Sequence, residues 1–238
     1  MSTPTMLLDR FADSIEHRQQ HWSRRSQELA THASKTHLAT LALTREAGTP
    51  GTSVAREVGA RLDWPVYDHE LVELIAKETG LRTSLLDSVD ERHRPWLLEC
   101  FETLGSARRV SESGYAVHVL ETVVALGTHG HCVIVGRGAA HILPSFSTLR
   151  VRLVAPLEDR IANAARQQNL SREDAARWVQ ETDRDRTEFV KSHFFKDPTD
   201  SRHYDLVLNT SRWSVPDSAD LIVHALHQLE SRLTDADS

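Results

Sequence analysis

One stretch of the sequence constrains the fold more than any other: an apolar run that breaks at a glycine-containing turn and is followed at once by an amphipathic segment. The run is His37–Leu43, the turn carries Gly48, Pro50 and Gly51, and the amphipathic segment begins near Thr52. This order predicts a strand, a glycine loop and a helix. The first turn of a helix has unpaired N–H groups and the positive end of the helix dipole, and glycine lets the backbone approach an anion closely. The stretch is therefore suited to binding a phosphate.

The loop nevertheless departs from the usual phosphate-binding pattern. That pattern is G-x-x-x-x-G-K-[ST], in which the lysine reaches the outer phosphates of a nucleotide and the hydroxyl holds magnesium. Here the loop is the shorter Gly48–Ser53, with a hydroxyl at Thr52 or Ser53 and no lysine before it. Taken alone, the loop leaves two alternatives open: a phosphate site, and an ordinary turn between a strand and a helix.

The composition limits the classes of partner. The 238 residues are 39% hydrophobic and 26% charged, which predicts a globular chain with an ample core. A net charge of −6 argues against broad nucleic-acid binding, which depends on a basic surface.

The two cysteines form no C-x-x-C motif, so neither a disulfide framework nor a structural zinc site is expected. No apolar run approaches the ~18 residues of a membrane span, and the start of the chain lacks the bases of a signal peptide. We therefore expect a cytoplasmic protein that binds neither nucleic acid nor a membrane.

Residues 5–33 form a separate element ahead of the glycine loop. Their apolar side chains fall on one face of a helix, and no glycine or proline interrupts them. We expect residues 1–35 to be a helical extension that packs either on the main domain or on a second subunit, in which case the protein would be a homodimer through this helix. A helix lying on a membrane surface is the alternative, weakened by the acids Asp9, Asp13, Glu16 and Glu28.

Four more apolar runs predict strands, with helical segments between them. The runs are Pro65–Tyr67, Cys132–Val135, Thr148–Val154 and Asp205–Asn209, and a closing helix is expected over Asp217–Leu233. Strands that alternate with helices indicate a parallel sheet. The predicted fold class is therefore α/β, with a five-stranded, mostly parallel sheet that has helices on both faces.

Two helices are expected between the last two strands. The first covers Leu157–Asn169, and Ser171 with Asp174 is a capping-box-like start for the second. The second helix carries a dense run of acids and bases, Asp183–Lys191, in which positions 184, 188 and 191 share one face. Such a run is either a solvated surface or a mobile lid whose arginines contact a transferring phosphoryl group. Both alternatives stay open here.

Charged residues also follow two of the predicted strands, at the edge where open α/β sheets bind ligands. Asp68 comes directly after the strand Pro65–Tyr67, and it either meets a ligand or caps the next helix. Arg137 lies in a G-R-G sequence after the strand Cys132–Val135, where burying an arginine without an anion is costly. Arg137 therefore contacts either a phosphate or base of a ligand, or an acid of the protein itself.

Taken in order, these blocks resemble the cytidylate kinase-like family, a branch of the P-loop nucleoside monophosphate kinases. The resemblance covers residues 37–230. The family's S-R-E-x-G-S-G-G is matched by Thr44–Gly51, its Y-D pair by Tyr67 and Asp68, its G-R-G by Gly136–Gly138, its D-R-x-R cluster by Asp183–Arg186, and its D-L-V-L-N-T by Asp205–Thr210. No single motif is specific, but their order and spacing together are.

The resemblance implies ATP-dependent phosphoryl transfer to a nucleoside monophosphate, with CMP or dCMP as the first candidates. It assigns the donor phosphates of ATP to Gly48, Thr49, Gly51, Thr52 and Ser53, and Mg²⁺ to Ser53. It assigns the acceptor to Asp68, Arg137 and Asp185, and the transferring phosphoryl group to Arg45, Arg184, Arg186 and Lys191. Arg45, just before the loop, is our candidate for the charge that the missing lysine would supply.

The resemblance also implies a division of the chain and some departures from the family's pattern. Residues 36–235 would be the kinase domain, with an acceptor-binding insert near 69–128 and a lid near 169–197. Cytidylate kinases carry G-R-D where this chain has Gly136–Gly138, and their lid pattern ends in an arginine where this chain has Lys191, which loses bidentate phosphate geometry. Two other functions therefore stay open: a nucleotide-binding regulatory or scaffold module with little turnover, and a kinase of another small phosphate-bearing metabolite.

Overall fold

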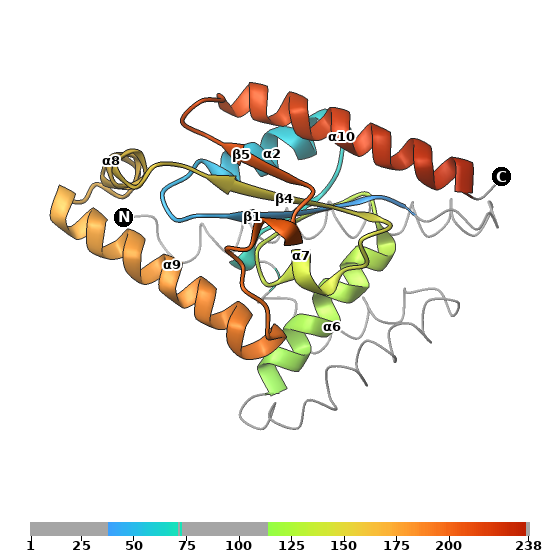
Figure 1. Ribbon diagram of the computed structural model, residues 1–238, viewed down its shortest axis with the longest axis horizontal. Coiled ribbons are helices and arrows are strands. Elements are labelled where there is room, and N and C mark those ends of the chain that lie inside the picture. Colours follow the sequence, from blue (N-terminus) through green and yellow to red (C-terminus); the bar gives the residue numbers. More distant parts are fainter. Residues whose placement is uncertain (1–37, 71, 73–113, 237–238) are drawn as a thin grey trace, which may run out of the picture. The chain divides into compact units, whose positions relative to one another are not determined.

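A computed structural model describes residues 38–70, 72 and 114–236, and every structural statement below concerns these residues (Figure 1). They contain one sheet in the order β2-β3-β1-β4-β5, and every described strand pair is parallel. The strands are β1 (Thr40–Arg45), β2 (Val66–Tyr67), β3 (Val133–Val135), β4 (Thr148–Val154) and β5 (Leu206–Asn209). The predicted α/β class with a five-stranded parallel sheet is confirmed.

Helices cover both faces of this sheet, as Figure 1 shows. One face is covered by α2 (Gly51–Leu62) and α10 (Val215–Ala236), which pack against each other. The short α7 (Ala139–Ile142) and α6 (Gly114–His129) lie on the other. The pair α8 (Leu157–Gln168) and α9 (Arg172–Phe194) lies between β4 and β5 in the chain, and a 3-10 turn, Ser201–His203, precedes β5.

The main core lies between the sheet and the helix pair α2 and α10. Leu41 of β1 and Val151 of β4 are fully buried, and Val54 and Ile222 pack onto them from the two helices. Strands buried on both faces read as continuous apolar runs, which is why the sequence revealed them. A second, smaller cluster joins the glycine loop to α8 and α9; its buried members are Ala47, Ile161, Ala164, Ala175 and Val179.

Several element boundaries agree with the sequence, but β1 extends from Thr40 to Arg45, two residues beyond the predicted end of the strand at Leu43. β4 has the predicted bounds, and α9 begins after Ser171, whose hydroxyl accepts the Asp174 N–H at 3.1 Å. The sequence did not predict α7, because four residues are too few to show a helical period. The helix expected over residues 5–33 and the helices expected within 73–113 lie outside the described residues.

The strand register brings the carboxyl ends of three strands to one edge. Leu43 of β1 pairs with Val135 of β3 and Val151 of β4. Arg45 therefore ends the central strand beside the G-R-G segment that follows β3. Because open parallel sheets bind their ligands at this edge, a ligand site is expected here.

A substitution in the central strand tests this description of the core. Leu41→Ala should lower the free energy of unfolding by about 2–5 kcal/mol, because it leaves a cavity at a fully buried position. Leu221→Ala, at a position 38% exposed on α10, should cost less than about 1 kcal/mol. Urea unfolding of the two variants makes the comparison, and equal losses would contradict the assignment of the core.

Candidate functional site

The glycine loop between β1 and α2 has a backbone that requires glycine at one position. Gly48 has a φ of +81°, and a Cβ there would overlap the backbone carbonyl of Arg160. Its own carbonyl accepts a hydrogen bond from Asn163 Nδ2 at 2.5 Å. α2 then begins at Gly51, with Pro50 at the N-cap, where a proline side chain has no acceptor to offer. The side chain of the N-cap residue therefore accepts no hydrogen bond from the first N–H groups of α2.

Charged side chains of α8 and α9 hold this loop from the outside. Asp183 Oδ1 accepts the Ala47 N–H at 2.7 Å, and Asp183 Oδ2 forms an ion pair with Arg160. Arg160 Nη1 also donates to the Ala47 carbonyl at 3.2 Å. One backbone amide of the loop is therefore bound by a carboxylate of the protein itself, and α9 is tied to the loop.

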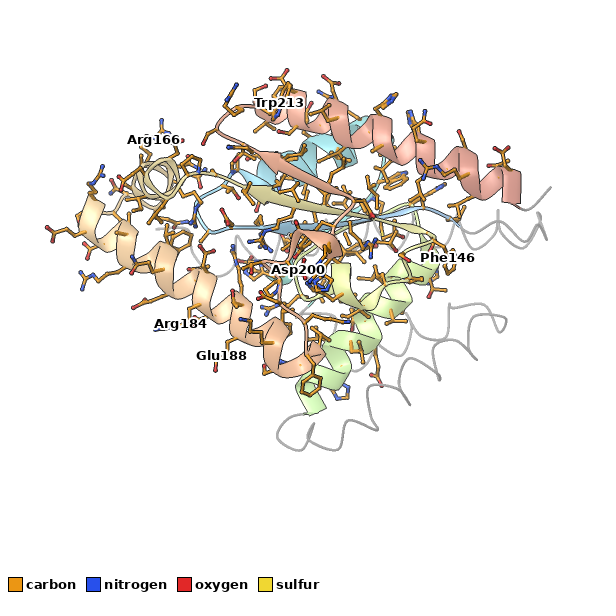
Figure 2. The ribbon with its side chains drawn as sticks, viewed as in Figure 1. Phe146, Arg166, Arg184, Glu188, Asp200 and Trp213 are labelled. Carbon is orange, nitrogen blue, oxygen red and sulfur yellow. The ribbon has the colours of Figure 1, made fainter. Side chains whose placement is uncertain are left out.

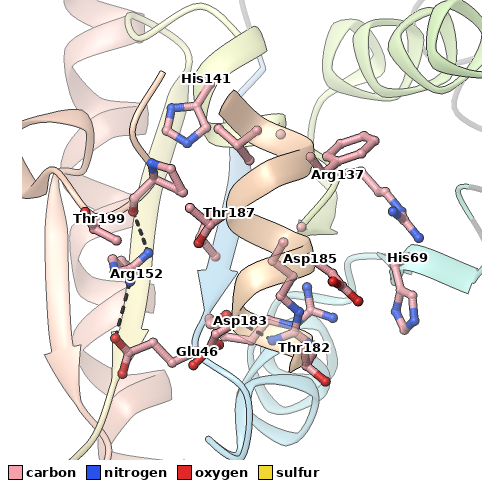
Figure 3. A pocket seen from close by; sticks show the side chains of 18 residues that line it. Glu46, His69, Arg137, His141, Arg152, Thr182, Asp183, Asp185, Thr187 and Thr199 are labelled. Atoms are coloured by element: carbon pink, nitrogen blue, oxygen red, sulfur yellow. Dashed lines mark hydrogen bonds and ion pairs between the residues drawn. The ribbon is translucent and has the colours of Figure 1, made fainter. Parts of the chain in front are cut away.

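Glu46 extends this network towards the sheet, as Figure 3 shows. Its carboxylate lies 3.3 Å from Arg152 Nη2 and 3.4 Å from Arg160 Nε, and it accepts the Ala155 N–H at 3.2 Å. Arg152 is buried in β4 and also donates to the Pro198 carbonyl at 2.5 Å. Glu46, Arg152, Arg160 and Asp183 thus form a connected set of opposite charges beneath the loop, which we call the loop frame.

Three arginines from different elements converge on the same crevice. Arg45 ends β1, Arg137 follows β3, and Arg186 lies in α9; all three line a cavity of about 430 Å³. Arg186 Nη1 donates to the Arg45 carbonyl at 3.1 Å, and the Arg137 guanidinium lies 5.4 Å from the centre of the Phe189 ring. Within the described part of the chain, neither Arg45 nor Arg186 forms an ion pair with a carboxylate.

The electrostatics of these arginines favour an anion. The pKa of Arg45 is lowered to about 9, first by burial and then by the charges of Arg186 and Arg137, while Asp68 opposes the shift. Burial and the charge of Arg186 also lower the pKa of Arg137, and burial lowers that of Arg186. A depressed arginine pKa means that the positive charge is held at a cost, which a bound anion would remove.

The G-R-G segment places Arg137 through an unusual backbone. Gly136, Arg137 and Gly138 have consecutive φ values of +81°, +51° and +73°. Left-handed backbone at a non-glycine residue is strained, and such strain is concentrated at functional sites. A Cβ at Gly136 would lie 2.5 Å from Arg45 Nη1, and a Cβ at Gly138 would overlap the Phe194 ring. The two glycines therefore leave room for Arg45 and for the end of α9.

Two histidines mark other parts of this cavity (Figure 3). The pKa of His69 is lowered by burial and then by the charges of Arg45 and Arg137. The pKa of His141 is lowered to about 4 by burial, with smaller contributions from His203 and other nearby cations. His141 packs edge-on against His203 and Tyr204, and the Tyr204 hydroxyl donates to the Pro198 carbonyl at 2.8 Å.

The structure brings together only part of the residue set chosen from the sequence. Arg45, Arg137, Asp185 and Arg186 line the cavity, and Asp68 is close enough to affect Arg45. The side chains of Arg184 and Lys191 are 71% and 55% exposed, and Figure 2 shows Arg184 directed away from the sheet. With Glu188 they line an open groove on the outer face of α9, so they are not gathered with the three arginines.

The loop hydroxyls also have distinct positions. Thr49 Oγ1 donates to the Glu46 carbonyl at 2.8 Å and so helps to close the loop. Thr52 is half-buried and Ser53 is exposed, both in the first turn of α2. Thr52 and Ser53 are therefore the loop hydroxyls at the helix N-terminus.

The sequence did not reveal the loop frame or His141. Glu46, Arg152 and Arg160 are far apart in the chain, and nothing local shows that they meet. One signal was available for α9, because Ala175, Val179 and Val190 mark its buried stripe and Arg186 lies on that stripe. The same spacing would have predicted that Arg186 lies on the buried side of α9 and that Arg184 does not.

Comparison with known proteins now gives the family. Residues 40–212 match the model of the family described as "Cytidylate kinase-like family". The chain belongs to the cytidylate kinase-like family. The match covers the glycine loop, the G-R-G segment, the loop frame and α9, so every described part of the site lies within the family's region.

Individual relatives of this family member were found by sequence and by structure. A protein named cytidylate kinase, from Methanopyrus kandleri, is 34% identical over an alignment of 112 residues that covers 43% of this chain and 58% of that relative. An uncharacterized protein from Eubacterium ventriosum has a similar structure, with a TM-score of 0.66 and 19% identity over 80% of this chain and 98% of the other. The second likeness shows a shared fold.

The described residues also lack a metal site and a helix that could cross a membrane. No group of three or more histidine, cysteine, aspartate or glutamate side chains there has the arrangement of a metal site. None of the described helices is long and apolar enough to cross a membrane.

Removing the carboxylate that ties α9 to the loop should destabilise the protein. Asp183→Ala leaves Arg160 and the Ala47 amide without their shared acceptor, and we expect a loss of about 1–3 kcal/mol in the free energy of unfolding. Asp183→Asn keeps one acceptor oxygen, so its free energy of unfolding should decrease less than that of Asp183→Ala. Asp185→Ala, whose side chain is 73% exposed on the same helix, should change stability by less than about 0.5 kcal/mol. Urea unfolding gives the three values, and a loss for Asp185→Ala as large as that for Asp183→Ala would contradict the loop frame.

The pKa of His141 predicts a pH dependence of stability. Its folded-state pKa of about 4 lies below the ordinary value of 6.5, so the unfolded chain binds more protons between these two values. The contribution of the neutral His141 ring to the free energy of unfolding is fully present above pH 6.5 and is lost as the pH falls through 4. Unfolding measured from pH 7 to pH 4 should therefore show a smaller decrease for His141→Gln than for the wild-type protein. Parallel curves would show that His141 is not buried as described.

Proposed function

We propose that this protein transfers a phosphoryl group from ATP to a nucleoside monophosphate, with CMP or dCMP as the acceptor. The observation that carries the proposal is the convergence of Arg45, Arg137 and Arg186 on one crevice beside a glycine loop at the carboxyl edge of a parallel sheet. Membership of the cytidylate kinase-like family supports this reaction class, and the name of the Methanopyrus kandleri relative supports the acceptor.

The donor side of the proposed site is the loop from Gly48 to Ser53. The N-terminus of α2 has free N–H groups and a positive dipole end, which together suit the phosphates of ATP. Mg²⁺ fits this position chemically, because it binds hydroxyl and phosphate oxygens, and Thr52 and Ser53 both carry a hydroxyl in the first turn of α2. When bound with ATP, the ion would neutralise charge on the phosphates.

The acceptor side is the crevice around Arg137. An arginine fork pairs with two phosphate oxygens at once, so Arg137 is assigned to the acceptor phosphate. Asp68 and Asp185 are assigned to hydrogen bonds with the rest of the acceptor. Phe189 stacks beside the Arg137 guanidinium and limits the directions in which it can point.

Arg45 and Arg186 are assigned to the phosphoryl group in transfer. Phosphoryl transfer needs little covalent chemistry from the protein, because positioning and charge stabilisation supply most of the rate. Both guanidinium groups are largely desolvated, so their charges act more strongly on the transition state than they would in water. Arg184 and Lys191 have no part in this assignment, because they lie on the outer face of α9.

Initial rates of ADP release, with ATP and Mg²⁺ against CMP, dCMP, UMP and AMP, test the proposal. We expect turnover with CMP or dCMP, and a decrease of at least about 100-fold in kcat/KM for Arg137→Ala. Arg166→Ala removes the same charge from an exposed position on α8 and should leave the rate unchanged (Figure 2).

Two results would overturn the proposal. Turnover that Arg137→Ala leaves intact would remove the crevice from the reaction. No turnover with any of the four acceptors, together with an ATP-dependent rise in melting temperature, would replace it with a nucleotide-binding module or with a kinase of another small metabolite.

A further inference from the structure

The missing lysine of the glycine loop has a structural counterpart. In the pattern G-x-x-x-x-G-K-[ST] the lysine directly precedes the hydroxyl residue. With Thr52 as that hydroxyl, residue 51 takes the place of the lysine and residue 45 takes the place of the first glycine. In this chain the two residue types are exchanged. Glycine is at 51, where the pattern has its lysine, and the basic residue Arg45 is where the pattern has its first glycine.

Positions 45 and 51 compete for the same space. A Cβ at residue 51 would lie 2.8 Å from Arg45 Cγ and 2.9 Å from Arg45 Cβ, closer than side-chain atoms normally approach. The crowded atoms belong to the base of the arginine and cannot move without moving the whole side chain. The Arg45 stem therefore occupies the volume in which a side chain at 51 would begin.

The backbone at residue 51 gives no other reason for glycine. Gly51 is the first residue of α2 and, unlike Gly48 and Gly136, does not have a positive φ. A lysine is compatible with the first turn of a helix, and the three atoms nearest to its Cβ would all belong to the Arg45 stem. The glycine at position 51 is therefore explained by the lack of room for a side chain, and not by the backbone conformation.

The path of the Arg45 side chain leads into the crevice. From Gly51 the stem continues to a second glycine, because Arg45 Nη1 lies 2.5 Å from where a Cβ of Gly136 would be. The guanidinium then lines the cavity together with Arg137 and Arg186. The two glycines form a passage for this side chain from the central strand to the site.

We infer that Arg45 and Gly51 are a reciprocal exchange of the glycine and lysine of a P-loop, so that Arg45 binds the outer phosphates of the donor nucleotide from the end of β1. This inference rests on the proposed function and assigns its donor site to one named side chain. It also explains why the loop functions without a lysine. An arginine fork can bind two phosphate oxygens, whereas a lysine binds as a point charge.

Four proteins test the exchange: the wild type, Arg45→Ala, Gly51→Lys, and the double variant R45A/G51K. Two quantities are measured for each full-length protein, the Kd for ATP in the presence of Mg²⁺ and the melting temperature without nucleotide. Arg56→Ala is the control, because it removes the same charge from an exposed position on α2.

The exchange predicts that the two changes compensate each other. Arg45→Ala should weaken ATP binding by at least about tenfold, as expected for the loss of a charged hydrogen-bond donor. Gly51→Lys alone should bind weakly and melt at a lower temperature than the wild type, because the two side chains collide. The double variant removes the overlap with Cγ but keeps the Cβ of residue 45, so it should melt at a higher temperature than Gly51→Lys without fully reaching the wild type. It should bind ATP within about threefold of the wild type, because the lysine then takes the normal role.

The possible results separate this inference from the proposed function. Wild-type binding that Arg45→Ala leaves unchanged, or a double variant no better than Arg45→Ala, overturns the exchange and leaves the kinase proposal standing. A Gly51→Lys protein that melts and binds like the wild type also overturns it, because the two positions then share no space. No ATP binding by the wild type overturns both.

Discussion

Three guanidinium groups in one half-buried crevice are the constraint on which the rest of the site depends. Like charges that lose contact with water repel each other and are costly to bury, and the lowered pKa of Arg45 shows that this cost is present. Folding the sheet brings Arg45 and Arg137 to adjacent strand ends, and α9 adds Arg186. An anion with several oxygens relieves all three charges at once, which a neutral ligand cannot do. The three lowered pKa values therefore favour an oxyanion in the crevice, in keeping with the phosphate binding that we propose.

Two of the acids that line this crevice, Glu46 and Asp183, are held by other basic groups, whereas Asp68 offsets part of the charge repulsion at Arg45. Glu46 follows Arg45 in the chain but turns away to Arg152 and Arg160, and Asp183 is held by Arg160 and the Ala47 amide. The charged side chains that line the cavity are thus divided into the neutral loop frame and a group of three arginines. A direct ion pair between Arg45 and Glu46 would stabilise both side chains and would remove the site.

The sequence predicted what is determined locally and missed what depends on contacts between distant elements. The bounds of β4, the end of α8 at Asn169 and the serine cap of α9 follow from apolar runs and from the chemistry of helix ends. The division between Arg184 and Arg186 depends on how α9 is rotated against the sheet, since residues two apart on a helix do not share a face. In the same way, Gly138 has room for no side chain only because Phe194, fifty-six residues later, packs against it. Such a contact leaves no mark in a single sequence.

α9 connects the two halves of the proposed reaction. Asp183 binds the amide of Ala47 in the donor loop, Arg186 donates to the carbonyl of Arg45, and Phe194 packs on the segment that carries Arg137. A displacement of α9 would therefore change the loop and the acceptor arginine together, because both are held by the same rigid helix. Nucleotide in the loop and anion at Arg137 would each favour the position of α9 that completes the other's site, and two ligands that stabilise the same position of one element bind cooperatively. In the proposed reaction, α9 would thus couple the binding of the donor to the binding of the acceptor.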